Sequence, residues 1–271
     1  MDEQRDRDIA DAAGGPPAAP PAGPPAAPPA APPAAPKGRR RVLGVATGAA
    51  VVAVAILLKL ALPLLIGTAV SGVLGNVFGG AYSKLPADQQ QALQRRVDAA
   101  IGTRLDGVPD AEQSTRIEAM VRSGLPRLSD APLVEKVHLT VKVLSATDEA
   151  TCARIARGIA TGVADKDATL KALEAVDVDS IGRWYDINVQ AIEADAASTP
   201  VRAVDPNDSE RILTGIASGF STAEAEQVGA LYRGGEVSDG DACGGLRAFY
   251  RHVETLPAGD LAVAALYDVA P

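Results

Sequence analysis

Histidine and cysteine are scarce in this chain of 271 residues, which has two of each. Zinc enzymes commonly use three histidine ligands, or histidine with paired cysteines, so His138 and His252 are too few for such a centre. No His-Glu-x-x-His motif occurs, and His252 lacks the Cys-x-x-Cys partner of a zinc deaminase. The sequence therefore predicts no metal and no other cofactor, and it places both histidines at the surface or at helix ends.

Motifs that identify a reaction are missing as well. The serine of Gly215 to Gly219 is the fourth residue of five, whereas a nucleophile elbow needs it third. The segment from Gly79 to Lys84 lacks the Gly-Lys-Ser/Thr order of a phosphate-binding loop. Aromatic residues make up only 3% of the chain, so four paired ones are expected to be its main packing anchors: Trp184, Tyr185, Phe249 and Tyr250.

Charged residues are missing from two consecutive stretches, Val42 to Leu58 and Leu60 to Ser83, which only Lys59 separates. A helix needs about 20 apolar residues to cross a bilayer, so residues 42–66 are expected to form one transmembrane helix. The basic cluster Arg39, Arg40 and Arg41 predicts that the N-terminal side stays in the cytoplasm. The expected protein is thus anchored once in a bacterial inner membrane, and its C-terminal part lies outside the cytoplasm.

Other topologies fit the apolar run less well. A cleaved signal peptide has its charges at the extreme N-terminus, whereas about forty residues precede this run. In a hairpin, Leu60 to Tyr82 would cross back and leave the C-terminal domain in the cytoplasm. A tight turn near Lys59 would favour Gly, Asn or Asp, but only Pro63 is available as a breaker. One crossing is favoured, and the hairpin stays open as the alternative.

Composition divides the chain into segments. Residues 1–36 hold eleven of the twenty prolines in a near-regular Pro-Pro-Ala-Ala repeat, which cannot bury a core and is expected to be a disordered cytoplasmic tail. Such a tail is either a spacer or a ligand for an aromatic-lined groove. We then expect a basic stop at residues 37–41 and a transmembrane helix at 42–66. A juxtamembrane helix at 67–82 and a soluble domain at 83–271 are expected to follow. The proline and alanine content is typical of a high-GC bacterial genome.

The soluble domain is acidic. Residues 1–82 hold seven of the 26 basic and five of the 34 acidic residues, which leaves 19 basic against 29 acidic residues in the domain. A net charge of −10 repels phosphate backbones and anionic headgroups, so nucleic-acid binding is not expected.

Helix-start signals recur along residues 83–271, and Ser221 to Glu224 is a capping box. The expected starts are Pro86, Pro109, Ser129, Asp148, Asp167, Asp179, Asp205, Ser221, Asp239 and Gly259. Residues 137–143 alternate with period two, so a strand is possible there; a helix is favoured because Leu133, Val137, Val141 and Leu144 share one helical face. From these ten candidate starts we predict an all-α domain of eight or nine helices.

Small residues recur at every fourth position before this domain. Gly67, Ser71, Gly75 and Gly79 share one helical face, and Gly44 and Gly48 repeat the spacing earlier. Such a face lets two membrane helices approach closely, so it predicts self-association or contact with a membrane partner. The alternative is chance, because glycine is common in this chain.

The two cysteines occupy similar positions. Cys152 follows Asp148 by four residues and Cys243 follows Asp239 by four, so each is expected in the first turn of a helix. In an oxidising compartment two cysteines without a third favour one structural disulfide. Two buried free thiols, or a reactive thiol at a helix N-terminus, are the alternatives.

No segment of the chain resembles a known family closely enough to transfer an activity. The favoured function is binding or assembly in the cell envelope by the helical domain, with the lipid bilayer and a second copy or membrane protein as partners. The alternative is an envelope hydrolase that uses carboxylates or His252. A pocket of convergent acids with raised pKa would favour the enzyme, whereas an exposed apolar helix face would favour the binding protein.

Overall fold

The computed structural model describes residues 80–270 except 164, 234 and 235. Several predictions concern residues outside this range: the proline-rich tail, the Arg39 to Arg41 cluster, the transmembrane helix 42–66, and the small residues Gly44, Gly48, Gly67, Ser71, Gly75 and Gly79. Within the described residues, no helix has both the length and the apolar character needed to cross a membrane.

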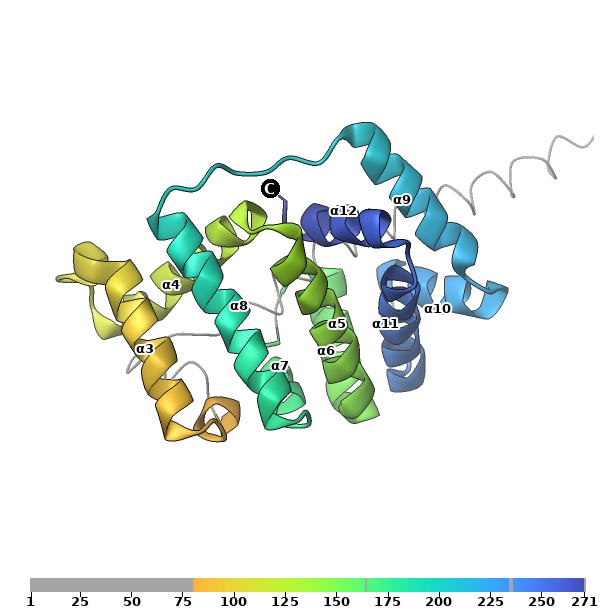
Figure 1. Ribbon diagram of the computed structural model, residues 1–271. Coiled ribbons are helices and arrows are strands. Elements are labelled where there is room, and N and C mark those ends of the chain that lie inside the picture. Colours follow the sequence, from red (N-terminus) through yellow and green to blue (C-terminus); the bar gives the residue numbers. More distant parts are fainter. Residues whose placement is uncertain (1–79, 164, 234–235, 271) are drawn as a thin grey trace, which may run out of the picture. The chain divides into compact units, whose positions relative to one another are not determined.

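The described residues form α-helices and short 3₁₀ turns, with no strand (Figure 1). The prediction of an all-α domain is therefore confirmed for this part of the chain. The α-helices are α3 (Ala87–Ile101), α4 (Asp110–Gly124), α5 (Asp130–Ala146), α6 (Glu149–Thr161), α7 (Lys166–Leu173), α8 (Val178–Ala196), α9 (Pro206–Gly219), α10 (Thr222–Tyr232), α11 (Asp239–Glu254) and α12 (Ala258–Val269). In the described part of the chain these ten α-helices exceed the eight or nine predicted, although they correspond to the ten candidate starts. The 3₁₀ turns η1 (Gly102–Leu105) and η2 (Leu125–Arg127) follow α3 and α4.

Side-chain caps fix many of the helix starts. Asp148 and Asp205 cap α6 and α9 as predicted, and the capping box of Ser221 and Glu224 is present at α10. The predicted starts at Asp167 and Asp179 are two residues late, because Asp165 and Asp177 accept the first-turn amide hydrogen bonds instead. Where two acidic residues lie two positions apart, the sequence alone does not decide which of them is the cap.

The segment with period-two alternation is helical. Residues 137–143 lie inside α5, so the strand alternative is wrong. On the predicted face Leu133, Val137 and Leu144 are buried and Val141 is half-buried, but Leu139 and Val143 on other faces are buried too. The reason is that α5 packs against α7, α8, α11 and α12. A helix surrounded on several sides does not show the simple apolar stripe of a surface helix.

Helices α5, α8 and α11 organise the packing. α8 contacts α3, α4 and α5, whereas α11 contacts α5, α6 and α10; α12 lies against α5 and α9 (Figure 1). Residues 197–205 run from α8 to α9 without regular structure. The backbone of Arg202 bonds to Pro126 and its guanidinium bonds to Leu128 and Asp130, so this connection is fixed to η2 and the start of α5.

The predicted aromatic anchors lie in the core. Trp184, Tyr185, Phe249 and Tyr250 are all nearly inaccessible to solvent. The folded domain also begins slightly earlier than residue 83, because Ala81 and Tyr82 are buried and the Tyr82 ring stacks edge-on against Tyr185. The end of the predicted 67–82 segment thus packs against α8.

Candidate functional site

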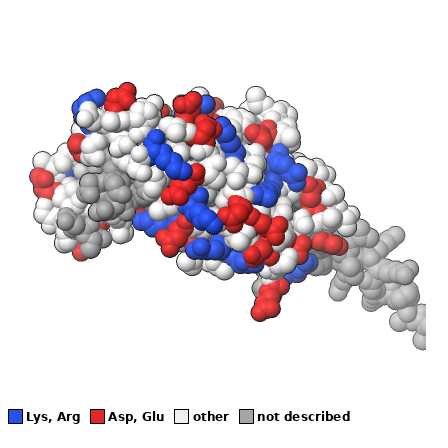
Figure 2. Space-filling model, turned by 90° about the horizontal axis from the view of Figure 1, so that it is seen from below, with Lys and Arg blue, Asp and Glu red and all other residues white. Residues whose placement is uncertain are grey.

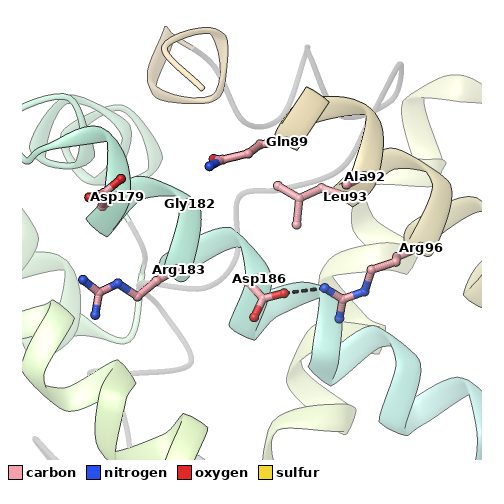
Figure 3. Close-up of a pocket in the computed structure, with 8 residues that line it drawn as sticks. All are labelled: Gln89, Ala92, Leu93, Arg96, Asp179, Gly182, Arg183 and Asp186. Atoms are coloured by element: carbon pink, nitrogen blue, oxygen red, sulfur yellow. Dashed lines mark hydrogen bonds and ion pairs between the residues drawn. The ribbon is translucent and has the colours of Figure 1, made fainter. Parts of the chain in front are cut away.

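A pocket of about 430 Å³ lies between α3 and α8 (Figure 3). It is lined by Gln89, Ala92, Leu93 and Arg96 of α3 and by Asp179, Gly182, Arg183 and Asp186 of α8. Its volume is within the range of sites that hold a small ligand. A pocket of that size also admits a few side chains of a protein partner.

Small residues create this pocket. Ala92 of α3 and Gly182 of α8 occupy positions where a larger side chain would fill the space between the helices. A Cβ added to Gly182 would lie 3.2 Å from Gln89 Oε1 and 3.7 Å from Leu85 Cδ2, so Gly182 allows the side chains of the α3 region to approach the α8 backbone. The pocket therefore depends on the identity of residues 92 and 182.

Arg96 connects the two helices across the pocket. Its Nε and Nη2 donate to the two carboxylate oxygens of Glu193 over 2.8 and 2.6 Å, and its Nη1 donates to Asp186. Figure 3 shows Arg96 and Asp186 pointing toward each other from opposite sides. The hydrogen bonds to Glu193, and then those to Asp186, raise the pKa of Arg96 despite its partial desolvation. A charged fork thus fixes the spacing of α3 and α8.

A second pocket continues along the same two helices. Its volume is about 680 Å³, and it is lined by Ala92, Arg95, Arg96, Ala99, Ala100, Glu193, Ala196 and Ala197. Because both pockets include Ala92 and Arg96, they are two parts of one depression, which we call the α3–α8 groove. Alanines form most of the second part, so its surface is shallow and apolar between charged edges.

The edges of the groove carry both signs of charge. Arg95, Arg96 and Arg183 lie beside Asp179, Asp186 and Glu193. Arg183 also approaches Glu135 of α5 at 3.2 Å. Figure 2 shows the same mixture on the face it presents, where basic and acidic side chains are interspersed. A partner that matches this groove needs charges of both signs around an apolar strip.

The groove lies next to the point where the described chain begins. The Tyr82 hydroxyl donates to the carbonyl of Gln90 in α3 over 2.8 Å, and its ring centroid lies 5.6 Å from that of Tyr185 in α8. Burial, and secondarily the charge of Asp98, raises the pKa of Tyr82. Lys84 donates to the carbonyl of Glu174 over 2.7 Å. These contacts fix the chain's entry relative to both helices of the groove.

The two cysteines form a disulfide, as the sequence predicts. Their sulfur atoms are 2.07 Å apart and their Cα atoms 5.2 Å apart, so Cys152 of α6 is joined to Cys243 of α11. Both residues are fully buried. The free-thiol and reactive-thiol alternatives do not apply to this structure. The cap of α11 is Ser238, one residue before the predicted start Asp239.

The histidines lie where the sequence places them. His138 is exposed and its Nδ1 is 2.8 Å from Glu254, whereas His252 lies in the last turn of α11 with Nε2 3.5 Å from Glu224. The Phe220 ring packs edge-on against His252. In the described part of the chain, no group of three or more His, Cys, Asp or Glu residues is arranged to hold a metal ion.

Two features would decide between an enzyme and a binding protein: convergent pocket acids with raised pKa, or an exposed apolar helix face. Neither is present in full in the described residues. Burial raises the pKa of Glu118, but this residue belongs to α4, its carboxylate lies 3.8 Å from Lys166, and it does not line the groove. The most exposed large apolar residues of the described range are Val163, Val178 and Val201, which lie in separate segments. The groove instead combines an apolar strip with ion-paired edges.

Sequence reasoning identified none of the groove residues as functional. They come from two helices that are about ninety positions apart, and each helix alone has an ordinary amphipathic pattern. The available signal was three small residues of α3, the exposed Ala92 and Ala99 and the half-buried Ala100, which is informative only once α8 is known to lie beside them.

Comparisons with known proteins give no relative from which a role could be transferred: no family model, no curated protein and no solved structure matches this chain.

Proposed function

We propose that this chain is a single-pass protein of a bacterial inner membrane whose helical domain binds a protein partner outside the cytoplasm. The α3–α8 groove carries the binding part of this proposal, since it is a continuous depression with an alanine-rich strip and charged edges. The partner that fits is a helix or extended segment whose small apolar side chains face the strip and whose charged side chains meet both edges.

The disulfide supports the proposed compartment. Disulfides persist in oxidising environments and are rare in the cytosol. The bond between Cys152 and Cys243 therefore agrees with the orientation that Arg39, Arg40 and Arg41 predict. The hairpin alternative would put the same bond in a reducing compartment.

The position of the groove supports a role near the membrane. The proposed transmembrane helix 42–66 ends fourteen residues before Gly80, and the chain enters the domain at Ala81 and Tyr82, beside α3 and α8. A partner in the same membrane could reach this face of the domain. The small-residue face of Gly67, Ser71, Gly75 and Gly79 would add a contact within the membrane or close to it.

The groove favours binding over hydrolysis. A hydrolase with two carboxylates needs at least one that is free to exchange a proton. Asp186 and Glu193, two of the three acids that line the groove, are both bound to the guanidinium of Arg96, so the third acid, Asp179, has no second carboxylate of the lining free to act with it. His252, the other candidate of the hydrolase hypothesis, pairs with Glu224 at the α9–α10 end of the domain.

Photo-crosslinking in intact membranes tests the binding proposal. A photoreactive amino acid in place of Gln89, an exposed residue that already has a long side chain in the groove lining, should give a discrete adduct, whereas the same residue at the exposed Thr214 of α9 should not. Adding Ala99→Arg in the second part of the groove should abolish the adduct from residue 89, and Thr214→Arg should leave it unchanged. Equal adducts from residues 89 and 214, or insensitivity to Ala99→Arg, would contradict a groove-bound partner.

Reporter fusions test the topology independently. A reporter active only outside the cytoplasm should be active after Pro271 and inactive before Val42. An inactive, well-expressed fusion after Pro271 would support the hairpin. Replacing Gly75 and Gly79 by Leu should reduce crosslinked dimers if the small-residue face associates, and unchanged dimers would assign that spacing to chance.

A further inference from the structure

Lys136 is completely buried. It lies on α5, and its Nζ has no hydrogen-bond partner among the described residues. A lysine ammonium is almost never removed from water without a paired charge. The complete burial of Lys136 therefore needs an explanation other than packing.

Two groups from other helices surround the ammonium. The Nζ lies 4.1 Å from the ring centroid of Trp184 on α8, a cation–π arrangement. The second group is Asp268 on α12, which is itself only 2% exposed. Helices α7, α8, α11 and α12 pack against α5, and among their described charged groups Asp268 is the one whose charge acts appreciably on Lys136. Asp268 lies one residue before Val269, the end of α12.

Two opposing effects act on the pKa of Lys136. Burial lowers the pKa of Lys136 to about 7, and the negative charge of Asp268 opposes this shift. If α12 moves away from α5, water reaches the ammonium and the pKa returns toward the ordinary value of 10.5. Between about pH 7 and 10.5, Lys136 is therefore protonated when α12 has moved away (the open arrangement) and neutral when α12 is packed on α5 (the closed arrangement).

We propose that Lys136, Trp184 and Asp268 form a proton-sensitive latch that sets how firmly the C-terminal helix α12 stays packed on α5. Proton uptake favours the open arrangement, so the latch weakens as the pH falls from about 10 to 7 and changes little below 7. The opening constant of α12 changes by up to tenfold per pH unit within that window. This device lies in the core and does not depend on the α3–α8 groove.

Trp184 reports on the latch directly, because it is the only tryptophan of the chain. Loss of the ammonium charge 4.1 Å from the indole changes its emission. Full-length protein in detergent should therefore show a Trp184 fluorescence transition with a midpoint near pH 7. Lys136→Met should remove the transition. Asp268→Asn should move the midpoint to lower pH, because Asp268 raises the pKa of Lys136.

Two control variants separate the latch from other titrating groups on α5. Lys142→Met removes an exposed lysine of the same helix, whose Nζ pairs with Asp177 at 2.5 Å, and should keep the transition. His138→Gln removes the exposed histidine that pairs with Glu254, and it should keep the transition too. Loss of the transition in His138→Gln would assign it to the histidine and overturn the proposal.

Hydrogen exchange of α12 supplies the second readout. After correction for the intrinsic pH dependence of exchange, α12 amides should become more protected between pH 7 and 9 in wild type and not in Lys136→Met. A wild-type protein whose Trp184 emission and α12 protection are both constant from pH 6 to 9 overturns the latch, whether or not the variants fold. An upward midpoint shift in Asp268→Asn overturns it as well.

Discussion

The two ends of the helical domain are stabilised in different ways. In α11, eight residues of a 16-residue helix are buried, and a disulfide joins this helix to α6. Around α3, only Leu93, Val97 and Ile101 of a 15-residue helix are buried, and surface hydrogen bonds from Arg96 attach it to α8. We call α6, α10 and α11 the crosslinked end and α3, α4 and α8 the groove end.

This difference indicates where function is located. A helix such as α3, with few buried side chains and partly exposed ion pairs, opens at low free-energy cost, and binding surfaces are commonly found on such helices. Its neighbour α8 is firmly packed, with nine buried residues. The crosslinked end provides a stable support, whereas the groove end has the concave surface. The predictions below test this division, in order of decreasing effect on stability.

The disulfide is expected to give the largest effect. It closes a loop with a sequence separation of 91, which corresponds to about 4.6 kcal/mol in the chain-entropy model. Cys152→Ser and Cys243→Ser should each lower the free energy of unfolding by a similar amount in denaturant titrations. The double variant should lose little more than either single variant, because both changes remove the same bond. Additive losses would mean that the two sites act through separate packing contacts.

Gly124 is the corresponding sensitive position at the groove end. A Cβ at Gly124 would lie 1.8 Å from the carbonyl oxygen of Ala191, so Gly124→Ala must push α4 away from α8. We expect a loss of about 3 kcal/mol, which exceeds the gain of up to about 1 kcal/mol that alanine brings to a helix.

Gly215→Ala is the matched control for this change. Gly215 lies within α9, and a Cβ there would meet no atom within 4 Å. Thermal unfolding should therefore show a higher melting temperature for Gly215→Ala and a lower one for Gly124→Ala. A stabilising Gly124→Ala would show that α4 and α8 are not in such close contact.

Between the two ends, Lys136 makes stability depend on pH. Its pKa is lowered to about 7 in the folded protein, whereas the unfolded chain keeps the proton up to about pH 10.5. The unfolded state thus binds more protons between these values, and stability should rise with pH by at most ~1.4 kcal/mol per unit. Denaturant titrations from pH 7 to 9 should show this slope in wild type and Lys142→Met. Lys136→Met should lack it, and an equal slope there would assign the effect to another group.

Arg96 should have the smallest effect on stability. Its ion pairs with Asp186 and Glu193 are about one-third exposed, and such pairs contribute less than about 1 kcal/mol. Arg96→Gln should therefore unfold almost as wild type while it weakens the crosslink from residue 89. A loss of several kcal/mol would show that Arg96 supports the fold and would weaken the contrast between the two ends.

The sequence was sufficient for local features of the fold. Caps such as Asp148, Asp205 and Ser221 act within one helical turn, and their spacing alone predicted α6, α9 and α10. The disulfide could also be predicted, because two cysteines allow one intrachain pairing and the predicted orientation puts them in an oxidising compartment. The burial of the four aromatic anchors could be predicted because aromatic residues are scarce in this chain, and a core with few large rings buries most of them.

Features that depend on several helices could not be predicted. Lys136 looks like a solvent-exposed residue next to Glu135 in the sequence, and only the positions of α8 and α12 show that it is buried. The groove likewise requires α3 and α8 to lie side by side. Alternation in α5 suggested a strand because a helix buried on several faces has no polar side to mark its period.

The most direct test of the proposed membrane orientation is the redox state of Cys152 and Cys243 in living cells. Cells would be quenched in acid, and full-length protein would be alkylated with a polyethylene-glycol maleimide before and after reduction. The account predicts no mass shift without reduction and a shift of two adducts after it, because the chain has two cysteines and both form the disulfide. Two adducts without reduction would place the domain in a reducing compartment and contradict an extracytoplasmic binding domain.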